Sequence, residues 1–373
     1  MTAFKKIVSV GIALFLSLYC LIGLGNNVSD DYKEYKNVIL MIGDGMGDGI
    51  LAATKQQHNV ELTLDTMPVK GHSDTRSFIR DYTDSAAGGT ALACGIRVWA
   101  NSLALFPFYP FAPADIRVPV SLTEVAKANG MAAGVVTTDQ TSGATPSAFS
   151  THVLSRDFEK NIAKDQLKSD LDLIWGGATE SITPENCEEA GFTYVSNVKE
   201  FNALEAGSRS FAQFNASDLK NCITTNTPSI TDMTKKAISI LNEDEDGFFL
   251  MVEGACIDKF SHSNEFAGAT MSAIEFDKAV AAALEFAKED GETLVVVTAD
   301  HETGGVTLNE ETGEYYYTTG DHTTRDVPVF VSATDAGFTD GCTVENRQIS
   351  VQIARVLGFD KSQFPAVKGF TID

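Results

Sequence analysis

Acidic and imidazole side chains come just after apolar runs at several points of this chain. Asp300 and His301 follow the run 293–298 (TLVVVT), and Asp44 comes just after the run 37–42 (NVILMI). Short apolar runs of this kind indicate buried strands. In open α/β sheets, ligands and catalytic groups gather outside the carboxyl ends of the strands, because several loops converge there. The pattern therefore predicts a metal site at one edge of a sheet.

A third apolar run, 248–252 (FFLMV), carries further ligand types. Glu253 follows it directly, and Asp258 and His262 come next with the i, i+4 spacing that places two side chains on one face of a helical turn. His322 precedes another strand-like run. Counted together, these positions offer four carboxylates and three imidazoles. Such a mixed set suits zinc, with a harder cation such as magnesium nearby.

Ser85 is the candidate nucleophile. It lies in the stretch DSAAGGTA, whose small residues indicate the first turns of a tightly packed helix. A serine at a helix N-terminus faces free backbone N–H groups, which favour a bound anion such as phosphate. A hydroxyl needs a base or a metal to become a good nucleophile, and no Gly-x-Ser-x-Gly motif surrounds Ser85. Metal activation is therefore the more economical interpretation.

Six segments resemble, in order, the alkaline phosphatase family: IGDGMG, TDSAAGGTALACG, GATPSAFSTHVLSR, VEGACIDKFSH, VTADHETGG and GDHT, which span residues 42–323. The resemblance implies an α/β fold, in which a three-layer sandwich has a largely parallel central sheet and helices on both faces. It also implies a hydrolase that cleaves phosphate monoesters through a phosphoserine intermediate. The cofactors it implies are two zinc ions and one magnesium ion.

The resemblance assigns metal ligands position by position. The first zinc would be held by Asp258, His262 and His322, the second by Asp44, Asp300 and His301, and the magnesium by Asp44, Thr145 and Glu253. Two zinc ions roughly 4 Å apart can stabilise both the attacking and the leaving oxygen of an in-line displacement.

The same resemblance assigns the substrate contacts. Ser85 would be the nucleophile, and Arg156 would bind two phosphate oxygens through its planar, permanently charged guanidinium. The chain departs from the family at Gly143, where other branches carry an acidic residue or a histidine. This removes one group near the magnesium, so Lys259 is expected to lack an acidic partner and to reach phosphate through water.

Composition predicts that residues 26–373 form one large domain of high solubility. The chain has 373 residues, of which 43% are hydrophobic, and its 51 acidic against 28 basic side chains give a net charge of −23. Such a charge argues against specific nucleic-acid binding and against stable contact with anionic membranes. The expected partners are small phosphate monoesters and, for the protein itself, a second copy in a homodimer.

The N-terminus has the pattern of an export signal. Lys5 and Lys6 precede the nearly continuous apolar run 7–24, which predicts a signal peptide over residues 1–25 and a periplasmic or secreted protein. An uncleaved membrane anchor is the alternative, because the run is about long enough to span a bilayer.

The rest of the chain alternates strands and helices. Helices are predicted at 121–129, 267–290 and 346–357, and strands at 132–138 and 171–175. The aromatic and proline-rich stretch 101–120 cannot form a regular helix and is predicted to cover the cleft or a subunit contact. The polar stretch 180–228 is predicted to be an irregular insertion, in which Cys187 and Cys222 form a disulfide.

Two other functions remain open on these residues. One is a metallo-hydrolase of the same superfamily that acts on diesters, sulfates or phosphomutase substrates. The other is a non-enzymatic protein that binds metal or phosphate. Ser85 together with Arg156 favours monoesters, and the complete set of zinc ligands favours an enzyme.

Overall fold

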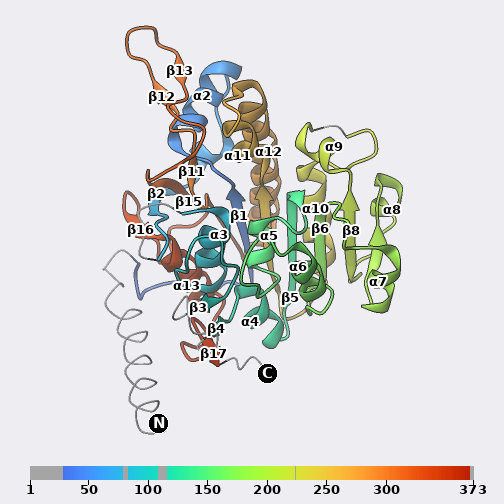
Figure 1. The fold of residues 1–373 in the computed structure, drawn as a ribbon. Coiled ribbons are helices and arrows are strands. Elements are labelled where there is room, and N and C mark those ends of the chain that lie inside the picture. Colours follow the sequence, from blue (N-terminus) through green and yellow to red (C-terminus); the bar gives the residue numbers. More distant parts are fainter. Residues whose placement is uncertain (1–27, 79–82, 108–115, 223, 370–373) are drawn as a thin grey trace, which may run out of the picture.

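The computed structural model describes residues 28–78, 83–107, 116–222 and 224–369 (Figure 1). The predicted signal peptide therefore lies outside the described residues, as does the segment 108–115 within the proline-rich stretch. Among the described residues, no helix is both long and apolar enough to cross a membrane.

A central sheet organises the described part of the chain (Figure 1). Its strand order is β16-β2-β15-β10-β1-β9-β5-β6-β8-β7. From β10 to β7 all neighbouring strands run parallel, whereas β15 is antiparallel to both β10 and β2. In chain order, the strands are β1 (Asn37–Gly43), β2 (Val69–Asp74), β5 (Ala132–Gln140), β6 (Leu173–Gly177), β7 (Thr193–Val195), β8 (Ser210–Phe214), β9 (Phe248–Gly254), β10 (Thr293–Thr298), β15 (Val327–Val331) and β16 (Thr343–Glu345).

Two apolar cores lie on opposite faces of this sheet, and β1 contributes to both. Val38 and Leu40 pack into one core, and Ile39 and Met41 pack into the other. Such a strand is apolar throughout because helices cover both of its faces. The helices of the first core include α3 (Ser85–Cys94), α4 (Leu122–Ala128), α5 (Ala144–Ala148), α6 (Glu159–Gln166) and α13 (Asn346–Val356); those of the second include α2 (Asp48–His58), α10 (Ile230–Leu241), α11 (Cys256–Ser261) and α12 (Phe266–Asp290). The predicted three-layer α/β sandwich with a largely parallel sheet is confirmed.

Local signals place most of these elements. The helix predicted at 121–129 is α4, which begins with a capping box between Ser121 and Glu124. The helices predicted at 267–290 and 346–357 are α12 and α13, and α12 ends at Gly291 in a left-handed conformation that favours glycine.

The prediction that the stretch 180–228 is irregular is wrong. This stretch holds three short helices, α7 (Pro184–Glu189), α8 (Val198–Asn202) and α9 (Ala216–Lys220), and two strands that extend the central sheet, β7 and β8. The helices are five or six residues long, too short to show a clear hydrophobic period. Side chains at their N-caps, such as Thr183 and Asn197, compensate by binding backbone N–H groups.

The predicted disulfide between Cys187 and Cys222 is also wrong, because both cysteines are free. Cys187 is buried within α7 and packs in the first core, whereas Cys222 is exposed beyond the end of α9. The polar sequence around each cysteine therefore did not mean that the two cysteines lie together in a loop.

Smaller sheets lie outside the central one. The ends of the proline-rich stretch form β3 (Phe106–Pro107) and β4 (Ile116–Pro119), which pair with each other and with β17 (Val367–Gly369). A hairpin joins β12 (Thr307–Leu308) and β13 (Tyr315–Tyr316), and β11 (Glu302–Thr303) pairs with β14 (His322–Thr323). The pairing of β11 with β14 brings His322 opposite Thr303, close to the end of β10.

Candidate active site

The carboxyl ends of three adjacent strands bring the predicted ligands together. On β1, Ile42 pairs with Thr298 of β10 and with Glu253 of β9, so the three strands end at nearly the same level. The chain then turns at Gly45, where φ is +69°; a Cβ at Gly45 would lie 2.9 Å from Cβ of Asp258. The loop that carries Asp44 therefore packs directly against the helix that follows β9.

Asp44, Asp300 and His301 form a buried cluster. Their ligand atoms lie within 4.8 Å of one another. Nε2 of His301 is 3.5 Å from Oδ1 of Asp44 and 3.4 Å from Oδ2 of Asp300. Burial, reinforced by His322, lowers the pKa of His301 to about 3, so the ring is neutral and forms no ion pair with either carboxylate. Oδ1 of Asp44 and Oδ2 of Asp300 each lack a hydrogen-bond partner among the described residues.

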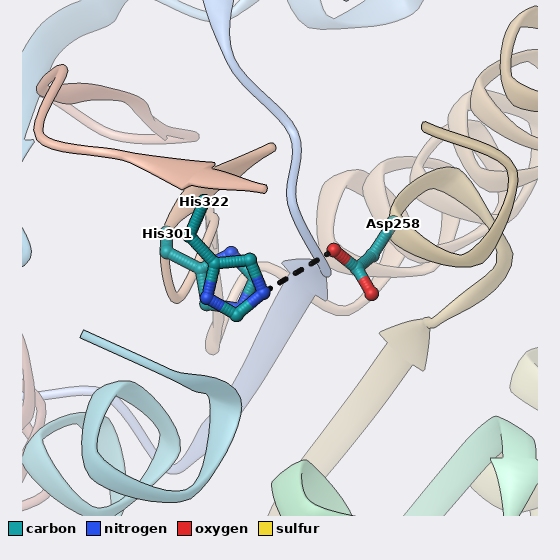
Figure 2. Close-up of side chains that lie close together, drawn as sticks. All are labelled: Asp258, His301 and His322. Atoms are coloured by element: carbon teal, nitrogen blue, oxygen red, sulfur yellow. Dashed lines mark ion pairs between the residues drawn. The ribbon is translucent and has the colours of Figure 1, made fainter. Parts of the chain in front are cut away.

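Asp258, His262 and His322 form a second cluster beside the first. Oδ1 of Asp258 lies 3.3 Å from Nε2 of His262 and 3.8 Å from Nε2 of His322, and the two Nε2 atoms are 3.2 Å apart. Figure 2 shows His322 stacked on His301 and facing Asp258. Asp258, His301 and His322 also have ligand atoms within 4.8 Å of one another, so the two clusters are contiguous.

Backbone carbonyls orient His262 and His322, the two histidines of the second cluster. Nδ1 of His262 donates to the carbonyl of Gly320 (2.6 Å), and Nδ1 of His322 donates to the carbonyl of Thr83 (2.9 Å). A carbonyl can only accept, so Nδ1 of each ring carries a proton. Nε2 is then the nitrogen of each ring that faces the cluster, in the orientation that a metal-binding imidazole requires.

Glu253 and Thr145 lie next to these clusters. Burial, followed by the charge of Asp139, raises the pKa of Glu253 to about 8, although the Thr137 hydroxyl donates to its carboxylate. Thr145 is 1% exposed, and no hydrogen bond of normal geometry reaches its Oγ1 among the described residues. Its hydroxyl nevertheless lies close enough to the Glu253 carboxyl to lower that group's pKa.

The structure corrects the expectation that Lys259 lacks an acidic partner. Nζ of Lys259 forms an ion pair with Oδ1 of Asp139, near the end of β5. The partner comes from a position four residues before Gly143, so the missing side chain at 143 does not leave the lysine unpaired.

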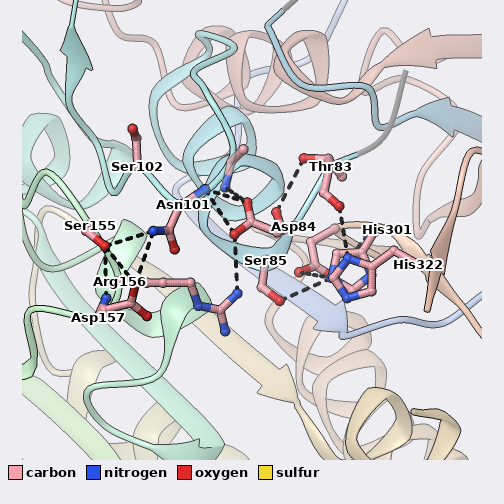
Figure 3. Close-up of polar contacts among 12 residues, drawn as sticks. Thr83, Asp84, Ser85, Asn101, Ser102, Ser155, Arg156, Asp157, His301 and His322 are labelled. Atoms are coloured by element: carbon pink, nitrogen blue, oxygen red, sulfur yellow. Dashed lines mark hydrogen bonds and ion pairs between the residues drawn. The ribbon is translucent and has the colours of Figure 1, made fainter. Parts of the chain in front are cut away.

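Ser85 is the first residue of α3 and is 4% exposed. Its Oγ lies 3.1 Å from Nε2 of His301, at the edge of the first cluster (Figure 3). The preceding residue, Asp84, is the N-cap of the helix and accepts from the backbone N–H of Ala87 (3.0 Å).

Arg156 approaches Ser85 from a separate segment. Its Nη1 donates to Oδ2 of Asp84 at 3.4 Å, and its backbone N–H donates to the carbonyl of Asn101 (3.0 Å). The N–H of Asn101 in turn donates to both oxygens of Asp84, at 3.0 Å each (Figure 3). Sequence reasoning did not include Asp84, although its place directly before a helix-initiating serine is an N-cap signal.

These residues fit divalent cations. Asp44, Asp258 and Asp300 are three carboxylates within a buried region, and burial raises the pKa of Asp44 and Asp300 because ionised groups lose their solvation there. Within the part of the chain that the structure describes, no hydrogen bond of normal geometry reaches Oδ1 of Asp44, Oδ2 of Asp300 or Oγ1 of Thr145. Bound cations would satisfy these oxygens and neutralise the charge. Mixed imidazole and carboxylate sets suit zinc, and the all-oxygen set around Glu253 suits magnesium.

Comparisons with known proteins agree with this geometry. The family model "Alkaline phosphatase" matches residues 35–319. Alkaline phosphatase 3 of Bacillus subtilis (strain 168) is 32% identical over 357 residues, which cover 90% of this chain and 75% of the relative. The structure of alkaline phosphatase from the Antarctic bacterium TAB5 superposes with a TM-score of 0.77 at 30% identity, covering 88% of this chain and 100% of that one.

Two variants of the TAB5 enzyme, in which a histidine is replaced by glutamate or by aspartate, are described with Mg bound in the M3 site. Each matches with a TM-score of 0.75 at 29% identity, covering 88% of this chain and 99% of that one. The chain belongs to the alkaline phosphatase family, as its motifs predicted. It is therefore an enzyme of that family, which supports phosphomonoesterase activity at a metal site.

Proposed function

We propose that this protein hydrolyses phosphate monoesters through a phosphoserine formed on Ser85, at a site that holds two zinc ions and one magnesium ion. The observation that carries the proposal is the position of Ser85. Its Oγ lies at a helix N-terminus, 3.1 Å from Nε2 of His301, and Arg156 reaches the same helix end through Asp84.

The residues that would hold the metals are those of the clusters described above. The first zinc would be bound by Asp258, His262 and His322, the second by Asp44, Asp300 and His301, and the magnesium by Asp44, Thr145 and Glu253. Bound there, the cations would supply the positive charge that stabilises the attacking and leaving oxygens of an in-line displacement. Magnesium in a third site of the TAB5 variants supports the assignment of the third ion.

The chain's own groups bind and orient the phosphoryl group. The guanidinium of Arg156 provides two parallel N–H donors for non-bridging oxygens, and the N-terminal N–H groups of α3 provide a favourable field for the anion. Oγ of Ser85 loses its proton and forms a bond to phosphorus as the bond to the leaving oxygen breaks, and the leaving oxygen takes up a proton to depart as the alcohol. Water then cleaves the Oγ–P bond, which releases phosphate and restores the serine.

The remaining features of the proposal concern the whole protein. We propose that residues 26–373 form one catalytic domain that is exported to the periplasm or the medium after removal of residues 1–25, and that it acts as a homodimer. The basic and apolar pattern of the N-terminal residues supports export. Mass spectrometry of the exported protein tests the removal of residues 1–25. Its sedimentation in solution tests the homodimer.

A comparison of three substrate classes tests the proposed chemistry. On one preparation, turnover of a phosphate monoester should greatly exceed turnover of a phosphate diester and of a sulfate ester. Ser85→Ala should lower monoester turnover by several orders of magnitude and leave metal content unchanged, because only the covalent step is lost. Ser239→Ala, on the exposed face of α10, is the matched control and should retain full activity. Faster turnover of the diester or the sulfate would reject the substrate class.

A further inference from the structure

The carboxylate of Asp139 occupies the space in which a side chain at position 143 would begin. A Cβ built on Gly143 would lie 2.5 Å from Oδ2 of Asp139, 2.8 Å from its Cγ and 2.9 Å from the carbonyl oxygen of Gln140. Distances this short do not occur between real atoms of this kind, so Asp139 in this orientation and a side chain at 143 exclude each other. The glycine is the N-cap of α5, and Asp139 comes from the end of β5.

The two oxygens of Asp139 have different surroundings. Oδ1 accepts from Nζ of Lys259 and from the backbone N–H of Gln140 (2.6 Å). Oδ2, which faces Gly143, has no hydrogen-bond partner among the described residues. The side chain is 17% exposed, so the carboxylate is fixed on one side and open on the other.

Thr137 links Asp139 to the proposed magnesium ligand Glu253, because its hydroxyl accepts from the backbone N–H of Asp139 (2.8 Å) and donates to the Glu253 carboxylate. Burial, followed by the charge of Asp139, raises the pKa of Glu253, which is 1% exposed. The Thr145 hydroxyl beside Glu253 is buried, and no hydrogen bond of normal geometry reaches it from the described residues. The ammonium group of Lys259 pairs with Asp139, and Glu253 and the Thr145 hydroxyl bring further oxygen donors to the same region. That combination is what a hard cation with oxygen ligands and bound water requires.

We propose that Asp139 is the acidic positioning residue of the third metal site, delivered from the end of β5 in place of a side chain at position 143. It favours magnesium beside Glu253 and Thr145 and fixes Lys259 at the rim of the site. The inference rests on the magnesium site proposed above. It also reverses the expectation drawn from Gly143 alone, because Asp139 supplies the acidic group that position 143 lacks.

Four proteins test the inference by relocating the carboxylate: the native chain, Asp139→Ala, Gly143→Asp, and the variant that combines both changes. Each is loaded with zinc and freed of magnesium, and magnesium affinity is measured by isothermal titration calorimetry. Asp139→Ala should weaken magnesium binding about 10-fold or more, as removal of a group that supports metal ligands typically does. Gly143→Asp alone should not tighten binding, because its side chain meets the Asp139 carboxylate.

The combined variant is the decisive one. With Asp139 shortened to alanine, the Cβ of an aspartate at 143 still meets the carbonyl oxygen of Gln140 at 2.9 Å, so the chain must shift slightly there, but the carboxylate is no longer opposed and should restore part of the lost magnesium affinity. A merely structural role for Asp139 would not produce this recovery. Asp139→Asn keeps the shape of the side chain and should weaken binding nearly as much as Asp139→Ala, so the result does not depend on one variant folding. Glu285→Gln removes an exposed acidic charge from α12 and serves as the charge control, with unchanged affinity.

The outcomes separate the two proposals. If the native chain binds no magnesium in addition to zinc, the proposed third metal fails. If the native chain binds magnesium and Asp139→Ala and Asp139→Asn bind it equally well, only the role of Asp139 fails. If both single Asp139 variants weaken binding but the combined variant recovers nothing, the claim that positions 139 and 143 share one functional space is overturned.

Discussion

Asp84 holds the guanidinium of Arg156 and caps the helix that begins with Ser85. Its Oδ2 accepts from Nη1 of Arg156 at 3.4 Å, and its Oδ1 accepts from the backbone N–H of Ala87 at 3.0 Å. One carboxylate thus fixes the candidate nucleophile and the candidate phosphate-binding group relative to each other. Small displacements of either group would separate them from a common phosphate, so positioning should matter more than the modest strength of each contact.

Substitution of Asp84 should separate these two roles. Asp84→Asn keeps a good N-cap but removes the charge opposite Arg156, so it should raise KM and weaken phosphate inhibition with little change in thermal stability. Asp84→Ala should do the same and also destabilise the protein by about 1 kcal/mol through loss of the cap. Steady-state kinetics and thermal unfolding of both variants measure the effects. Equal kinetics for the native protein and Asp84→Asn would show that the contact does not position Arg156.

Arg156 itself should contribute to anion binding and not to metal binding. Arg156→Ala should raise KM and weaken inhibition by phosphate, because a charge-assisted contact of roughly 1.5–3 kcal/mol is lost. Zinc content should stay unchanged, since no ligand is removed. Arg156→Lys should recover only part of the loss, because an ammonium group cannot bind two oxygens in the same planar way. Unchanged phosphate inhibition in Arg156→Ala would exclude the assigned role.

The strand ends of the site were predictable because they depend on local pattern. A buried parallel strand is apolar throughout, so the runs before Asp44, Glu253 and Asp300 could be recognised one by one. Their convergence follows from the general rule for parallel sheets, and the register of β1 with β9 and β10 confirms it. The family motifs then added roles that spacing alone leaves open.

The partner of Lys259 was not predictable in the same way. The resemblance to the family places the acidic partner at position 143, whereas the carboxylate belongs to Asp139 on a different element. Only the three-dimensional path from β5 to α5 shows that the two positions share one space. The short elements within 180–228 were not predicted for a related reason. Their helices depend on N-cap hydrogen bonds and their strands on pairing at the edge of the sheet, and neither leaves a hydrophobic period in the sequence.

Removal of the metals should make stability depend strongly on pH. In the metal-free protein, burial and the charge of Asp139 raise the pKa of Glu253 to about 8, and burial with the charge of Asp258 raises that of Asp300 to about 6. The folded state therefore binds protons more tightly than the unfolded state. The contribution of these two groups to stability is largest below their unfolded pKa values, near 4, and is lost as pH rises through the folded values.

Thermal unfolding of metal-free and metal-loaded protein between pH 5 and pH 9, roughly the range of these titrations, measures this dependence. The melting temperature of the metal-free protein should fall with rising pH more steeply than that of the loaded protein. Glu253→Gln should flatten the metal-free curve at its alkaline end. Parallel curves for the two native forms would contradict the view that cations neutralise these carboxylates.

The acidic surface should make catalysis tolerant of salt. With a net charge of −23, the protein as a whole repels an anionic substrate, and only the metals and Arg156 attract it at short range. The second-order rate constant should therefore stay level or rise as ionic strength increases to about 0.5 M, where screening reduces the repulsion. A steep fall would instead indicate a long-range positive field that guides substrate to the site.

Identification of the phosphorylated residue tests the central claim most directly. The native protein is mixed with a labelled phosphate monoester, quenched in acid and digested, and the label is located by mass spectrometry. The label should be found on the peptide that contains Ser85, and Ser85→Ala should carry none. Stoichiometric label on any other residue of the native protein would contradict the proposed phosphoserine mechanism.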